Sequence, residues 1–101
     1  MDVTTLISDT KARFSHNSAK AYLKEKYESK LIVAEQGGLW KADLITINFL
    51  NSSKDKKVVL IDTFGNPVQI VRTDLLTKLK DTYNEVMSDW YQEWSELEKK
   101  R

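Results

Sequence analysis

The sequence contains no cysteine, and among its 101 residues it has only one histidine, one proline and three glycines. Without cysteine the chain forms no disulfide, no thiolate metal site and no thiol nucleophile. The single histidine, His16, argues against a histidine-based zinc site or a Ser–His catalytic triad. No spacing of acidic, serine or glycine residues identifies a catalytic or phosphate-binding group. The sequence therefore predicts a non-enzymatic protein without catalytic residues, metal or cofactor.

Long apolar runs are also absent. The longest uncharged stretch begins at Leu44 and stops before Lys54, well short of the roughly 20 residues that span a bilayer. Asp2, Thr4 and Thr5 occupy positions where a signal peptide would carry basic and apolar residues. We therefore expect a cytoplasmic or nuclear protein with no membrane among its partners.

The composition is that of one globular domain over residues 1–101, with 41% hydrophobic and 31% charged residues. The few glycines and the proline separate short β-branched segments in the middle of the chain. Gly37 and Gly38 follow one such segment, and the run Gly65-Asn66-Pro67 separates two others. A third turn is expected at 51–55, which is polar throughout. These signals predict an antiparallel meander of short strands over residues 30–72.

Helical periodicity marks both flanks of this meander. Residues 3–14, with Leu6, Ile7 and Phe14, and residues 18–29 predict two short helices, the second capped by Asn17 or Ser18. Beyond the meander, Thr73 or Asp74 can cap a single helix that runs to about Lys99. The chain is thus expected to comprise a helical segment over 1–29, the meander, and a long helix over 73–101. That helix would be about 40 Å long, more than twice a strand of ~17–20 Å.

Two short sequence motifs within the predicted meander occur in the order that is typical of one domain family. The first is Leu39-Trp40-Lys41-Ala42-Asp43-Leu44, and the second, Ile61-Asp62-Thr63-Phe64-Gly65-Asn66, precedes a valine-rich strand. On these phrases residues 31–76 resemble a Tudor domain, a member of the SH3-like barrel group. The resemblance implies an α+β fold in which an antiparallel barrel of four or five strands is flanked by N-terminal helices and one long C-terminal helix.

Many Tudor domains bind methylated lysine or arginine in an aromatic cage, whose ring faces attract a cation. The resemblance places Trp40 and Phe64 in two cage walls and Asn66 at the polar position. Ile61 and Glu35 or Gln36 stand where further aromatic residues are usual, so the cage is incomplete. The resemblance thus implies a ligand groove of Trp40, Phe64, Asn66 and Ile61, while burial of the two aromatic side chains in the core is the alternative.

The C-terminal helix carries an apolar stripe of nearly heptad period. Its members, at spacings of three and four, are Leu76, Leu79, Tyr83, Val86, Trp90, Trp94 and Leu97, and Met87 and Tyr91 widen it. Either the N-terminal helices cover this stripe, or it is an interface for a second copy or another protein. The predicted interface residues are Tyr83, Met87, Trp90, Tyr91, Trp94 and Leu97.

Acidic residues recur every four positions on the same helix, at Asp81, Glu85, Asp89 and Glu93. Like charges at this spacing are unfavourable in an isolated helix. Lys20 and Lys24 show the same spacing near the N-terminus. Antiparallel pairing of the two helices, within the chain or across a dimer, would offset the repulsion.

These observations predict a protein-binding adaptor or regulatory factor whose helices dock a protein partner, as a homodimer in the leading version. Nucleic-acid binding is the alternative, since five basic residues could form a rim beside the Trp40 groove. They are Lys41, Lys54, Lys56, Lys57 and Arg72. The net charge of only +1 makes strong non-specific phosphate binding unexpected. A methyl-lysine or methyl-arginine reader is the third hypothesis.

Overall fold

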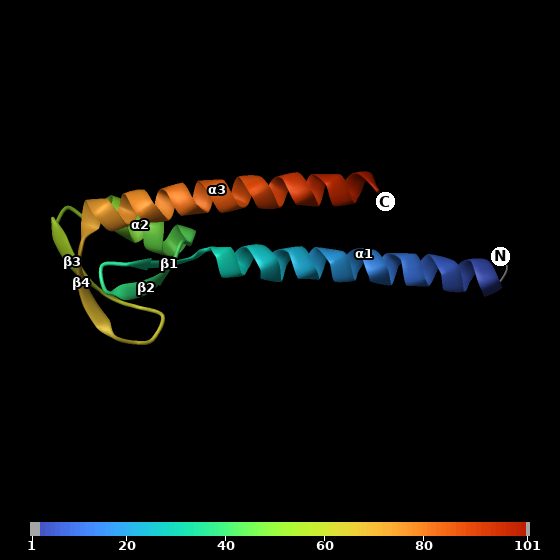
Figure 1. Ribbon diagram of the computed structural model, residues 1–101, viewed down its shortest axis with the longest axis horizontal. Coiled ribbons are helices and arrows are strands. Elements are labelled where there is room, and N and C mark those ends of the chain that lie inside the picture. The colour runs from blue at the N-terminus through green and yellow to red at the C-terminus, as the bar shows by residue number, and fades with distance from the viewer. Residues whose placement is uncertain (1–2, 101) are drawn as a thin grey trace.

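The computed structural model describes the backbone of residues 3–100 and the side chains of residues 15–100. In chain order the elements are α1 (Val3–Lys30), β1 (Ile32–Glu35), β2 (Gly38–Lys41), α2 (Leu44–Ser52), β3 (Lys57–Ile61), β4 (Pro67–Val71) and α3 (Arg72–Lys99). The molecule is elongated, with extents of 66 × 25 × 19 Å. Figure 1 shows α1 and α3 antiparallel and side by side, with both hairpins and α2 gathered at one end.

The two flanking helical regions are confirmed, but the predicted break in the first is wrong. Helix α1 continues through Ser15–Ser18, so neither Asn17 nor Ser18 is an N-cap. The polar residues are tolerated there because His16 turns toward α3 and bonds Glu98, while Asn17 and Ser18 face solvent. The side chains of Leu6, Ile7 and Phe14 lie outside the described residues.

Strands β1 and β2 form a hairpin at the predicted glycine turn. Its two central residues, Gln36 and Gly37, have φ of 50° and 80°, as a type I′ turn requires. The Gln36 amide then holds the hairpin against β4, since its oxygen accepts from the Val71 N–H at 2.7 Å and its nitrogen donates to the Val71 carbonyl at 3.2 Å. This turn therefore fixes the first hairpin against the second.

Strands β3 and β4 form the second predicted hairpin, with Ile61 paired to Pro67. Asp62 organises the connecting loop, because its carboxylate accepts from the backbone N–H groups of Phe64 and Asn66, both at 3.0 Å. Gly65 in that loop has φ of 83°. The Phe64-Gly65-Asn66 sequence therefore forms the turn of a two-stranded hairpin.

The predicted Tudor-like barrel is wrong. The two hairpins are separate two-stranded sheets and no strand closes them into a barrel of four or five strands within the described chain. The segment between them, expected to continue the meander, forms helix α2. Asp43 caps this helix, its carboxylate accepting from the Thr46 N–H at 2.8 Å, and Ile47 and Leu50 turn one face into the core.

The core lies where α3 meets the hairpins and α2, and it continues along the contact between α1 and α3. Leu50, Ile70, Leu75 and Leu79 are almost fully excluded from solvent. Arg72 closes the end of this core: its Nε donates to the Asp55 carbonyl and its Nη1 to the Leu50 carbonyl, each at 2.9 Å. The hairpins and α2 thus anchor the first turns of α3, and the rest of α3 has only α1 beside it (Figure 1).

Candidate protein-docking surface

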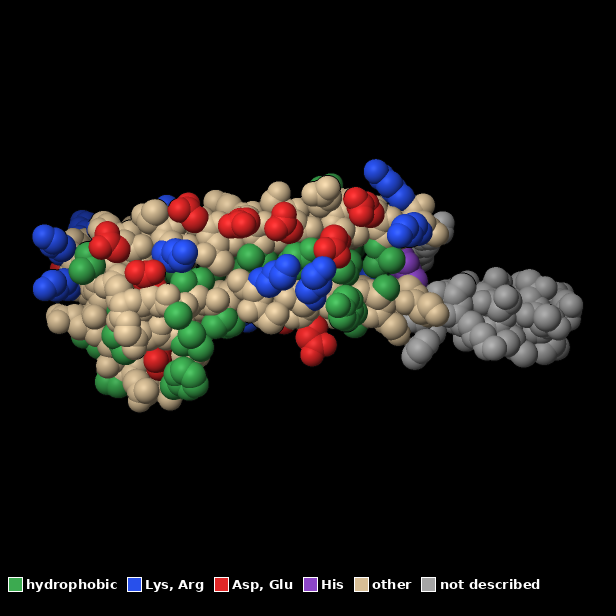
Figure 2. Space-filling view, viewed as in Figure 1, with side chains coloured by type: hydrophobic (Ala, Val, Ile, Leu, Met, Phe, Trp, Pro, Cys, Tyr) green, Lys and Arg blue, Asp and Glu red, His purple; other side chains and the backbone are tan. Residues whose placement is uncertain are grey.

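The contact between α1 and α3 is built around stacked aromatic rings. Tyr27 of α1 is buried and lies against Trp90 of α3, with ring centroids 6.1 Å apart and planes 10° apart. The Tyr27 hydroxyl donates to Glu93, and Lys26 Nζ binds the same carboxylate oxygen at 2.8 Å. The predicted antiparallel pairing of basic and acidic helices therefore occurs within the chain. Figure 2 shows the acidic row on α3 beside lysine side chains.

A second ionic cluster joins the two helices nearer the end of α3. Glu98 Oε1 lies 2.7 Å from Lys20 Nζ and 3.2 Å from His16 Nε2. The same Lys20 ammonium lies 5.9 Å from the centroid of the Trp94 ring, in the range of a cation–π interaction. One face of Trp94 is thus held by α1, while 40% of the residue stays exposed.

These clusters make the α1–α3 contact pH-dependent. Hydrogen bonds from Lys26 and Tyr27 hold the pKa of Glu93 below its ordinary 4.5, and a hydrogen bond from Lys20 lowers the pKa of Glu98. The Glu93 carboxylate in turn raises the pKa of Lys26 and of Tyr27 above their ordinary 10.5 and 10.0. The ionic clusters therefore stabilise the α1–α3 contact fully at pH values above the ordinary pKa of glutamate and below those of tyrosine and lysine. This stabilisation is lost as the pH falls through the lowered pKa values of Glu93 and Glu98, and it is also lost at strongly alkaline pH.

We expect the urea midpoint of unfolding to fall as the pH is lowered from about 6 to about 3, and Glu93→Gln to remove part of that dependence. The matched control is Glu96→Gln, because Glu96 lies one turn further on α3 and is exposed. Identical pH profiles for the two variants would contradict the role of Glu93.

The outer flank of α3 carries an open apolar groove. Met87, Trp90, Tyr91 and Trp94 line it, with a volume of about 340 Å³. Tyr91 is 69% exposed and stacks on Trp94 at a centroid distance of 6.1 Å. A cluster of exposed aromatic residues is unusual on the surface of a monomeric protein. Tyrosine and tryptophan are also among the residues that contribute most to binding at protein interfaces.

The predicted interface residues thus divide between two faces of α3. Tyr83, Met87, Trp90 and Leu97 pack against the core, and Tyr27 of α1 stacks on Trp90. Tyr91 and Trp94 lie on the neighbouring flank, and Met87 and Trp90 link the two faces because they also line the groove. Apolar spacing alone does not separate the two faces, although the widening of the stripe at Met87 and Tyr91 indicates a second one.

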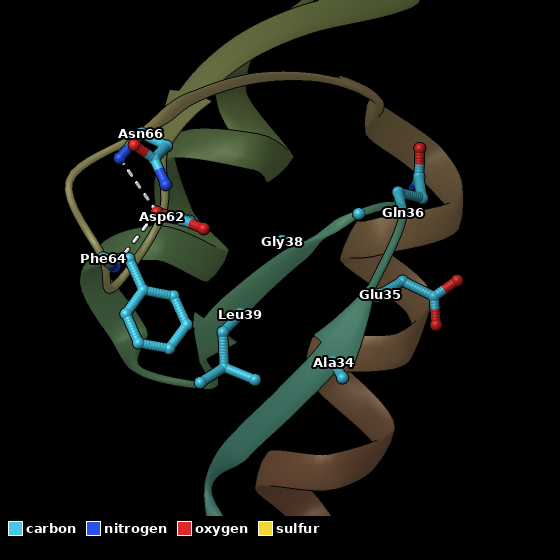
Figure 3. A pocket seen from close by; sticks show the side chains of 9 residues that line it. Ala34, Glu35, Gln36, Gly38, Leu39, Asp62, Phe64 and Asn66 are labelled. Atoms are coloured by element: carbon cyan, nitrogen blue, oxygen red, sulfur yellow. Dashed lines mark hydrogen bonds between the residues drawn. The ribbon is translucent and has the colours of Figure 1, made fainter.

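The predicted barrel groove is not formed as expected. Trp40 is only 3% exposed, packs over Gly38 and donates its indole N–H to the Glu35 carbonyl at 2.8 Å. It therefore cannot be a wall of a ligand cage. Phe64, Ile61 and Asn66 are exposed, and Figure 3 shows Phe64 and Leu39 on one side of a shallow pocket between the hairpin turns. The Asp62 carboxylate beside them is already engaged by the loop N–H groups.

The basic residues named for nucleic-acid binding are also placed differently from the hypothesis. Lys41, Lys54, Lys56 and Lys57 are exposed, but Arg72 is engaged by two backbone carbonyls. The aromatic partner of this rim was Trp40, which is buried. The structure therefore does not present Trp40 beside these lysines as the stacking platform that the hypothesis required.

The described residues contain neither a metal-binding cluster nor a membrane-spanning helix. No three histidine, aspartate or glutamate side chains among them are arranged to hold a metal ion. None of the described helices combines the length and apolar character needed to cross a membrane. Comparison with protein-family models, with curated proteins and with solved structures found no match.

Proposed function

We propose that this chain is a non-catalytic protein-binding module and that the groove of Met87, Trp90, Tyr91 and Trp94 is its docking surface. The observation that carries the proposal is the exposure of Tyr91 and Trp94 beside an apolar groove on a helix whose other apolar side chains pack against the core. Burial of these side chains by a partner would release apolar area from water. Their rigid rings lose little conformational entropy on binding, which favours them as interface anchors.

The surroundings of the groove support docking of a helix. The groove runs along α3, and the Trp94 ring lies between the Lys20 ammonium, at 5.9 Å, and the Tyr91 ring, at 6.1 Å, two contacts that restrict its motion before a partner arrives. Preorganised aromatic side chains reduce the ordering cost of association. An amphipathic helix inserts side chains at spacings of three and four into such grooves.

The test uses two tyrosines of nearly equal exposure. A display library of amphipathic helical peptides is selected on the chain, which is immobilised at low density so that neighbouring copies do not meet. We expect selected peptides to bind the Tyr91→Ala variant about tenfold or more weakly. Tyr22→Ala is the matched control, because Tyr22 is 66% exposed on α1 and Tyr91 is 69% exposed on α3. Peptide affinities are measured by titration calorimetry.

Equal binding to the wild-type and Tyr91→Ala chains, or a library with no enriched peptide, would contradict the proposed docking surface. Loss of binding in both tyrosine variants would point to general loss of structure, and far-ultraviolet circular dichroism separates that case. The cytoplasmic or nuclear location expected from the sequence stays a prediction.

A further inference from the structure

The docking flank of α3 carries opposite charges at equal distances from its centre. Residues at spacings of four and three form a continuous outer stripe: Lys80, Asn84, Met87, Tyr91, Trp94 and Glu98. All six lie at heptad-like positions of one helix, and none is fully buried. The apolar residues occupy the middle, and the two ends carry opposite charges. Lys80 lies nine residues before Asp89 and Glu98 nine residues after it.

We propose that the occupant of this flank is a second copy of the chain, with the two α3 helices antiparallel about a two-fold axis at the level of Asp89. This inference rests on the proposed function. The two-fold operation places Lys80 opposite the second copy's Glu98, and Met87 opposite the second copy's Tyr91. Each contact then occurs twice, as an isologous interface requires.

Charge selects the antiparallel orientation. In a parallel pair, the Lys80 residues of the two copies would lie opposite each other, and so would the two Glu98 residues. Like charges placed opposite each other are unfavourable. In the antiparallel pair, Lys80 joins the ionic cluster that Glu98 already makes with Lys20. Affinity comes from the apolar centre, and the charged ends set direction and register.

The acidic row does not oppose this arrangement. At about 100° per residue, Glu85, Asp89 and Glu96 project from the opposite side of α3, and Asp81 projects about a quarter turn away from the outer stripe. These residues are exposed, and Figure 2 shows the acidic row on the face of α3 that is turned to the viewer. Two copies can therefore meet without bringing their acidic rows together.

The length of α3 is sufficient for the contact. With the axis at Asp89, residues 79–99 of the two helices overlap over about 30 Å, or about three heptads, which is the minimum run of a two-stranded coil. Residues 72–78, which carry the hairpins and α2, lie outside the overlap. The anchored end of each copy thus projects beyond the free end of the other.

The cysteine-free sequence allows a direct distance test, since a single introduced cysteine is the only labelling site. Thr77→Cys and Ser88→Cys each place a spin label at an exposed position beside the outer stripe. In the antiparallel dimer, the two Thr77 sites are separated along the axis by ~36 Å and the two Ser88 sites by only ~3 Å. Pulsed electron paramagnetic resonance should therefore give a clearly longer distance for Thr77→Cys than for Ser88→Cys.

A charge reversal tests the register. Lys80→Glu should weaken self-association, measured by sedimentation equilibrium, by about tenfold, because it places two carboxylates opposite each other at both ends. Lys78→Glu is the matched control: Lys78 is exposed and two positions away, on the opposite side of the helix. Equal weakening by both variants would overturn the proposed pairing of Lys80 with Glu98.

The remaining outcomes separate this inference from the proposed function. Similar short distances at both label positions would mean a parallel dimer and would overturn the antiparallel arrangement. A strict monomer at ~0.1 mM, with no dipolar coupling between labels, would overturn self-association altogether. If the peptides selected on isolated copies still depended on Tyr91, the docking surface would stand and its occupant would be another protein.

Discussion

Replacing Trp40 with alanine is expected to lower the free energy of unfolding by about 3–5 kcal/mol, as measured by urea denaturation. The side chain is 3% exposed and pairs with Val33 across the first hairpin, on the face turned to the core. The variant would lose the packing of the whole indole ring and leave a cavity beside Gly38. It would also leave the Glu35 carbonyl without its indole donor.

Two variants isolate the physical cause. Trp40→Phe keeps most of the buried ring but not the N–H donor, so its cost should be well below that of alanine. Trp94→Ala removes the same type of side chain from the open flank of α3, where 40% of the residue is exposed, and its effect on stability should be smaller. A loss below about 1 kcal/mol in Trp40→Ala would mean that the ring is on the surface, as the ligand-groove hypothesis required.

The features predicted correctly are those determined by local signals. Both hairpin turns follow from glycines that adopt positive φ, at Gly37 and Gly65. The long C-terminal helix follows from apolar spacing sustained over many turns, and the structure ends it at Lys99 as expected. Such signals depend on a few neighbouring residues, so they can be interpreted correctly without knowing which segments pack against them.

The features predicted wrongly depend on contacts between distant segments. Trp40 and Phe64 were assigned to one groove, yet the former is buried and the latter is 74% exposed. The difference in exposure depends on how the two hairpins pack together. That packing includes the hydrogen bonds of the Gln36 side-chain amide with the Val71 backbone, between residues 35 positions apart. A phrase-by-phrase likeness to a barrel family contains no information on such a contact.

The same distinction applies to the docking surface. Spacing alone shows that α3 carries these aromatic residues, but the division of α3 into a face that packs on α1 and a face that stays open depends on where α1 lies. That position is set by Tyr27 against Trp90 and by the ion pairs of Lys20 and Lys26. The ends of the outer stripe, Lys80 and Glu98, were not singled out because polar residues at heptad positions carry no hydrophobic signal.

The fold differs most from the predicted barrel at α2, which is a helix where a strand was expected. Three alanine substitutions test whether this segment is helical. We expect Ile47→Ala and Leu50→Ala each to lower the free energy of unfolding by about 2–5 kcal/mol, because these side chains are 7% and 0% exposed. Phe49→Ala should cost less than about 1 kcal/mol, because the ring is 49% exposed on the outer side. Urea denaturation of the three variants provides the measurement.

This large, small, large pattern is specific to a helix. Positions 47 and 50 lie on one helical face with 49 on another, whereas a strand would place 47 and 49 together and 50 on the opposite side. The β-branched composition of the segment favours a strand, but the Asp43 cap and the burial of Ile47 and Leu50 against the core outweigh that preference. Comparable losses in Ile47→Ala and Phe49→Ala, with little change in Leu50→Ala, would instead restore the continuous meander and with it the route to a closed sheet.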